Sequence, residues 1–69
     1  MFYKRIKDLR TDSDLSQGRI AKIIGLHKTT YARYETGQRE IPFSVAILLA
    51  KHYNVSLNYL AEITNDPKL

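Results

Sequence analysis

Cysteine is absent from this 69-residue sequence, which therefore has neither a disulfide framework nor a thiolate metal site. Long apolar runs are absent as well, because the longest, residues 45–50, is far too short to cross a bilayer. No phosphate-cradling glycine loop or Ser, His and acid constellation can be assembled, and the two histidines lack metal-ligand spacing. We expect a cytoplasmic protein without a membrane span, cofactor, metal ion or enzymatic activity.

The remaining composition predicts one small all-α domain that covers residues 1–69. Hydrophobic residues make up 43% of the chain, which is enough for one compact core with little spare stability. No linker, repeat or low-complexity segment divides the chain, and no β-type alternation is longer than three residues.

Two short helices bent around Gly25 form the most informative pattern in the chain. Apolar residues recur with helical spacing after Ser16, whose hydroxyl can cap a helix start. Gly25 suits the left-handed residue that ends a helix, and Gly37 is a second terminator of this kind. The pattern predicts helices over 17–24 and 28–36, joined by a short turn, which is a helix-turn-helix.

The second helix of this pair has two unlike faces. With about 100° per residue, Tyr31 and Tyr34 fall together on an apolar side. The opposite side carries Lys28, Thr29, Ala32 and Arg33. A major groove can admit such a low, donor-rich surface. The same pattern also fits the solvent-exposed face of an ordinary surface helix that binds nothing.

Three further helices are predicted around this pair, over residues 2–10, 44–53 and 57–63. Asn54 tolerates the left-handed backbone that ends the second of them. Ser56 can cap the third. The sequence therefore predicts five helices in total.

Positive charge is concentrated in the half of the chain that contains the helix pair. The net charge is +4, and residues 1–39 hold nine Lys or Arg against four acids, whereas residues 40–69 hold two against three. A surface that neutralises phosphates has this asymmetry. A basic surface that only keeps the protein in solution would have it too.

Three stretches together resemble the Cro/C1-type helix-turn-helix domain of phage repressors and small bacterial transcriptional regulators. They read L-S-Q-x-x-I-A-x-x-I-G-L, T-Y-A-R-Y-E-T-G-x-R-E-I-P and L-A-K-H-Y-N-V-S-L-N-Y-L. The resemblance spans roughly residues 3–63, and the combined spacing is specific. It implies a compact five-helix, lambda-repressor-like domain that binds double-stranded DNA with the helix at 28–36 in the major groove. The function it implies is a repressor that reads a palindromic operator.

The resemblance also assigns roles to individual residues. The family's base-reading positions fall on His27, Lys28, Thr29 and Arg33. Gln17 is implied to bind a phosphate and to brace the recognition helix, and the further phosphate-binding candidates are Arg19, Lys22, Thr30, Gln38 and Arg39. Because the family commonly has Ser or Thr at the position of His27, this residue could instead be a weak cap or a bystander.

Arg10 and Glu35 match an internal ion pair of the family, between the first and third helices. Their separation in the sequence could not have shown this pairing. The chain also departs from the family at Gly18 and Arg19, where a capping box is missing. Since Gly18 costs about 1 kcal/mol against Ala, we expect the helix at 17–24 to fray at its start.

A homodimer is expected because two recognition helices about 34 Å apart would double the DNA contact. The predicted interface residues are Leu57, Tyr59, Leu60 and Ile63, with Leu48 or Phe2 as additions. Ordinary core packing is the alternative for Leu57, Leu60 and Ile63. The helix at 44–53 also has more apolar residues than a core needs, and a second copy could cover the surplus, which is Val45, Ile47 and Leu48.

Two other functions share this domain type. An antitoxin binds a toxin as well as its own operator, and a structural adaptor has lost DNA binding. A toxin partner would need an extension, and only six residues follow the last predicted helix, so we expect a plain repressor.

Overall fold

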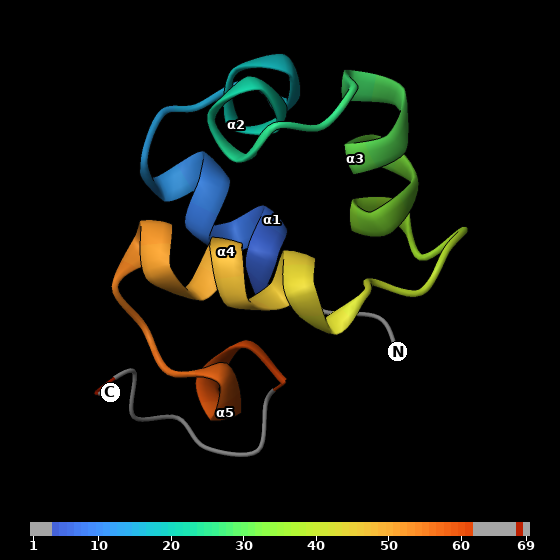
Figure 1. The fold of residues 1–69 in the computed structure, drawn as a ribbon. Coiled ribbons are helices and arrows are strands. Elements are labelled where there is room, and N and C mark those ends of the chain that lie inside the picture. Colours follow the sequence, from blue (N-terminus) through green and yellow to red (C-terminus); the bar gives the residue numbers. More distant parts are fainter. Residues whose placement is uncertain (1–3, 62–67, 69) are drawn as a thin grey trace.

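The computed structural model describes residues 4–61 and 68 of the chain (Figure 1). These residues form five helices and no strand, which confirms the all-α prediction. The helices are α1 (Lys4–Asp12), α2 (Gln17–Ile24), α3 (Lys28–Thr36), α4 (Phe43–Tyr53) and α5 (Leu57–Leu60). In Figure 1, α2 and α3 lie at one end of the molecule and α5 lies at the other, with α1 and α4 between them.

The first helix ends later than the sequence predicts. It was expected over 2–10, of which residues 2 and 3 lie outside the described part, and it continues to Asp12. Asp14 follows with a left-handed φ of 56°, and the amide of Leu15 donates to the carbonyl of Arg10 at 3.1 Å. This is the hydrogen-bond pattern of a helix end that usually has glycine. An aspartate tolerates the same backbone, so the signal was missed.

Both predicted ends of α2 are confirmed. The Ser16 hydroxyl accepts from the amide of Arg19 at 3.0 Å, which satisfies one of the free donors of the first turn. Gly25 has a φ of 81°, and the Leu26 amide donates to the carbonyl of Ala21 at 2.8 Å. This left-handed glycine turns the chain out of α2 and toward α3.

The last two helices keep their predicted caps with small shifts at the ends. The fourth begins one residue early, since the Pro42 carbonyl accepts from amides of the first turn, and it ends at Asn54 with a φ of 57°. The Ser56 hydroxyl caps α5 as predicted. The helix predicted over 57–63 ends at Leu60, and residues 62–67 lie outside the described part.

One apolar core joins all five helices. Its fully buried members include Ile6 of α1, Ile20 of α2, Tyr31 of α3, Leu49 of α4 and Leu60 of α5. These side chains fix the orientation of α2 and α3 relative to the rest of the bundle, because a close-packed interior leaves them little freedom to shift.

For two apolar residues, the burial in the structure is the opposite of what the sequence predicted. Val45 is 6% exposed and belongs to the core, although it was counted among the surplus apolar residues. Ile23 is 47% exposed, although it was grouped with the inward residues of α2. It lies about 160° around the helix from the buried Ala21, which is too far for both residues to face the core.

Candidate nucleic-acid interface

The third helix separates its tyrosines from its polar side chains as the helical wheel indicated. Tyr31 and Tyr34 are buried. The residues predicted to read bases are all exposed, and these are His27, Lys28, Thr29 and Arg33. Between the two sides lie Thr30 and Ala32, which are half-buried. The exposed face therefore combines two cations, a hydroxyl and an imidazole, which can hydrogen-bond to base edges or phosphates.

A bidentate ion pair fixes α3 to α1. The guanidinium of Arg10 donates to both oxygens of Glu35, from Nε at 2.8 Å and from Nη2 at 2.9 Å. Its third nitrogen donates to the carbonyl of Leu15 at 2.8 Å. The side chain of Glu35 is 2% exposed and that of Arg10 is 13% exposed, so the pair lies at the edge of the core.

Gln17 connects the start of α2 to the same carboxylate. Its Nε2 donates to Oε1 of Glu35 at 3.1 Å, so this residue holds α2 and α3 together at the point where the predicted phosphate contact would be made. The bracing part of the expected role is present as a hydrogen bond. The phosphate part stays a prediction.

The ionisation of this cluster follows from its hydrogen bonds. Burial acts to raise the pKa of Glu35, but the hydrogen bonds from Arg10 and Gln17 outweigh it and hold this pKa below its ordinary value. The hydrogen bond to Glu35 raises the pKa of Arg10. Burial raises the pKa of Tyr53 to about 12 and that of Tyr31 further, because a buried phenolate lacks water around it.

Further exposed cations lie on α2 and in the loop after α3. Arg19 and Lys22 are exposed on α2, and Gln38 and Arg39 are exposed after the end of α3. The Arg39 amide donates to the carbonyl of Arg33 at 3.2 Å, so the loop folds back on the helix end. Among residues 4–61, no acidic side chain forms a salt bridge with any of the five cations of α2, α3 and this loop.

The structure resolves one of the alternatives for His27. Its backbone has the extended conformation of a helix cap, but its side chain makes no capping hydrogen bond. The imidazole is exposed and therefore available for a contact outside the molecule.

One contact in this region was not foreseen from the sequence. Gly18 faces the side chain of Lys28, whose Cδ lies 3.6 Å from the position that a Cβ on Gly18 would occupy. The aliphatic part of Lys28 thus lies against the first turn of α2, in the direction in which helical side chains lean. No local pattern indicates such a contact, because ten residues separate the two positions.

The predicted dimer residues are distributed differently from the expectation. Leu60 is fully buried and cannot reach a second copy without unfolding α5, so its role as an interface residue is wrong. The ring of Tyr59 lies 4.1 Å from the guanidinium carbon of Arg5, which occupies one of its faces. Leu57 is half-buried and Leu48 is 44% exposed. Ile63 and Phe2 lie outside the described residues.

Residues 4–61 contain no group of three or more His, Cys, Asp or Glu side chains that could hold a metal ion. Within this range, no helix has the length and apolar content that crossing a bilayer requires.

Comparison with known proteins places this geometry in a family. A helix-turn-helix family model matches residues 6–60. The chain is 33% identical over 67 residues to the HTH-type transcriptional regulator YobD of Bacillus subtilis, covering 97% of the chain and 60% of the relative. It is 39% identical over 66 residues to the cryptic phage CTXphi transcriptional repressor RstR of Vibrio cholerae, covering 96% and 57%.

A third relative has a different role. The antitoxin PezA of Streptococcus pneumoniae is 34% identical over 56 residues, which covers 81% of the chain and 35% of that protein. The chain spans about three-fifths of the length of YobD and RstR. No solved structure matches it significantly.

Proposed function

The chain belongs to the helix-turn-helix family, and we propose that it is a sequence-specific DNA-binding regulator of transcription, a repressor that reads a palindromic operator as a dimer. The observation that carries the proposal is the division of α3 into a buried tyrosine side and an exposed side with Lys28, Thr29 and Arg33. The names of YobD and RstR support it. In this role the protein works in the cytoplasm of a bacterium, binds no cofactor and catalyses no reaction.

In this proposal, each residue of the helix pair has a role that its chemistry allows. Arg33 and Lys28 donate to guanine O6 and N7, and Thr29 contacts a base or a thymine methyl. His27 donates to a base or a neighbouring phosphate. Phosphate contacts come from Gln17, Arg19, Lys22, Thr30, Gln38 and Arg39. Glu35 and Arg10 contact no DNA and hold α3 in position.

The antitoxin function gains no separate support. The similarity to PezA covers these same helices and 35% of that protein, and a shared DNA-binding domain accounts for it. We therefore propose no toxin partner.

Selection from random duplex DNA, followed by titration of the selected site and a scrambled duplex, tests the proposal. We expect Arg33→Ala to weaken binding to the selected site by about 1–3 kcal/mol and to relax the preference at one base position. Lys7→Ala, which removes an exposed cation of α1, is the matched control and should leave the preference unchanged. If the unmodified chain binds selected and scrambled duplexes equally at modest salt, the proposal is wrong.

A further inference from the structure

We propose that Gly18 is a specificity-determining residue of the DNA contact, because its lack of a side chain makes room for Lys28 and so sets where the ammonium of that lysine meets a base. The inference rests on the proposed function, in which Lys28 reads a base, and it adds the residue that positions Lys28. Gly18 is a positioning residue in this account and acts through the lysine side chain.

The stem of Lys28 lies against the first turn of α2. Its Cδ is 3.6 Å from the point that a Cβ on Gly18 would occupy, which is ordinary contact distance for a single methyl group. Leaving aside the backbone of α2 and the two adjoining residues, this Cδ is the only heavy atom of the described residues within 4 Å of that point. A longer side chain at residue 18 would therefore compete with the lysine stem for the same space.

Little of the Lys28 side chain extends past this contact. Only Cε and the ammonium nitrogen follow Cδ, so two bonds of about 1.5 Å each separate the contacting atom from the charge. Lys28 is exposed and Gly18 is half-buried, as expected where an aliphatic stem covers a surface and its charged end stays in water. A flexible lysine stem loses affinity when DNA has to order it, and this contact orders much of the stem beforehand.

The packing of α2 against α3 supports the position of the lysine stem. At about 100° per residue, Lys28 and Glu35 lie only about 20° apart around α3, so they share one side of this helix. Glu35 accepts a hydrogen bond at 3.1 Å from Gln17, which directly precedes Gly18. The side of α3 that carries Lys28 therefore faces the first turn of α2 at two points.

No acidic side chain of the described residues competes with DNA for the Lys28 ammonium. The first turn of α2 contains no acid, and its cation Arg19 directly follows the glycine. The carboxylate of Glu35 already accepts from Arg10 and Gln17. Within residues 4–61, Lys28 forms no salt bridge. Its positive charge is therefore available to donate to the O6 and N7 atoms of a guanine.

The other two polar residues of the exposed face lie farther around α3. Thr29 and Arg33 are about 100° and 140° from Lys28 on the helical wheel, and both are exposed. Gly18 therefore supports one of the three base contacts in the proposed function. A change at residue 18 should alter the preference at the base pair read by Lys28 and leave the preference at the base pair read by Arg33.

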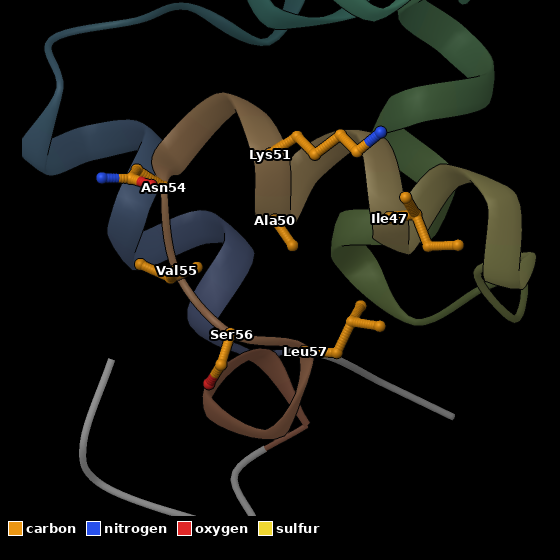
Figure 2. A pocket seen from close by; sticks show the side chains of 7 residues that line it. All are labelled: Ile47, Ala50, Lys51, Asn54, Val55, Ser56 and Leu57. Carbon is orange, nitrogen blue, oxygen red and sulfur yellow. The ribbon is translucent and has the colours of Figure 1, made fainter. Parts of the chain in front are cut away.

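The contact lies at the end of the molecule away from an apolar groove between α4 and α5. This groove has a volume of about 410 Å³, and its apolar lining comes from Ile47, Ala50, Val55 and Leu57 (Figure 2). In Figure 1, α2 and α3 lie at the opposite end of the molecule from α5. A substitution at Gly18 leaves the groove unchanged, so its effect on DNA binding would arise at the helix pair.

Two substitutions of Gly18 in the full chain test the proposal. Leucine and alanine both favour a helix over glycine, but only leucine needs the space of the Lys28 stem, so Gly18→Ala is the matched control. We expect Gly18→Leu to weaken binding to the selected duplex at least about 10-fold and to relax the preference at the same base pair as Lys28→Ala. Gly18→Ala should bind within about twofold of the unmodified chain. A Gly18→Leu variant that keeps the unmodified preference would overturn the proposal.

A double-mutant cycle shows whether Gly18 acts through Lys28. In a chain that already carries Lys28→Ala, we expect Gly18→Leu to change the affinity for the selected duplex by less than about twofold. Additive losses would overturn the proposal, because a general disturbance of α2 would add to the loss of the lysine. Equal losses on selected and scrambled duplexes would also overturn it, since Lys28 would then contact a phosphate.

An NMR measurement without DNA separates this inference from the proposed function. We expect a nuclear Overhauser effect between Hα of Gly18 and Hδ of Lys28 in the unmodified chain, and its loss in Gly18→Leu. If this signal is absent while the chain selects a duplex, the positioning proposal fails and the proposed function stands. If the signal is present but no duplex is selected, the proposed function fails, and the specificity role of Gly18 fails with it.

Discussion

Arg10 and Glu35 show how two residues far apart in the sequence determine the position of a recognition surface. Glu35 belongs to α3 but faces inward, where it accepts hydrogen bonds from Arg10 and Gln17. Through this one carboxylate, α3 is connected to α1 and to the start of α2. The exposed side of the same helix is thereby held in a fixed direction.

Removing one member of this pair should destabilise the fold. We expect Glu35→Gln or Arg10→Met to lower the free energy of unfolding by about 3 kcal/mol, because a charge would remain at a buried position without its counter-ion. Urea unfolding followed by circular dichroism measures it. The double variant Arg10→Met with Glu35→Leu should recover much of the loss. A double variant as unstable as both single variants added together would contradict this account.

The same carboxylate should make stability depend on acid pH. The pKa of Glu35 is lower in the folded chain than its ordinary value of about 4.3, so the folded state favours the ionised form. This contribution is fully present above about pH 4.3 and is lost as the pH falls through the lower, folded pKa. We expect unfolding free energies between pH 7 and pH 2 to fall less steeply in the double variant than in the unmodified chain.

At the scale of the helix, the residues at the helix ends predict the structure most clearly, because they set where each helix begins and ends. Left-handed residues follow four of the helices, at Asp14, Gly25, Gly37 and Asn54. Serine hydroxyls cap α2 and α5. These ends depend on residues within a few positions of one another, and they set the length and direction of each helix.

Two glycines of the helix pair should respond oppositely to alanine. Gly18 lies inside α2 without a positive φ, and an added Cβ would make only ordinary contact with Lys28, so Gly18→Ala should stabilise the fold by about 0.5–1 kcal/mol. Gly25 has a φ of 81°, so Gly25→Ala should cost about 1 kcal/mol, although no atom lies within 4 Å. Thermal and urea unfolding of both variants measure the difference. A destabilised Gly18→Ala variant would show that the Lys28 stem cannot give way.

At the scale of the whole molecule, the two ends of the bundle have different surface chemistry. Exposed cations gather on α2, α3 and the following loop, whereas the groove between α4 and α5 is mainly apolar. In the proposed function, the cationic end binds a polyanion. The core between the two ends makes them parts of one rigid body.

The cations at this end should determine how binding depends on salt. We expect Lys22→Ala or Arg39→Ala to weaken binding to selected and scrambled duplexes by similar factors and to reduce the slope of log K against log salt by about 1, because one fewer phosphate is neutralised. Titrations at several salt concentrations measure the slope. Lys7→Ala should leave it unchanged. A loss confined to the selected duplex would identify Lys22 or Arg39 as a base-reading residue instead.

The sequence by itself determined the helices, since their signals are local. Ser16, Gly25, Asn54 and Ser56 act on neighbouring backbone groups, and they occur in the structure at the predicted ends. The direction of α3 was also predictable, because a helix repeats every 3.6 residues and the two tyrosines define its inner side. The family resemblance added the pairing of Arg10 with Glu35, which no local pattern contains.

Only the tertiary structure decided which apolar side chains the core accepts. Val45 and Leu60 are buried, whereas Ile23 and Phe43 are exposed, and hydrophobicity alone does not distinguish them. Burial depends on which helices approach one another and how closely, and this is set by contacts between residues far apart in the chain. For the same reason, only the folded molecule shows the groove beside Ile47 and the contact between Lys28 and Gly18.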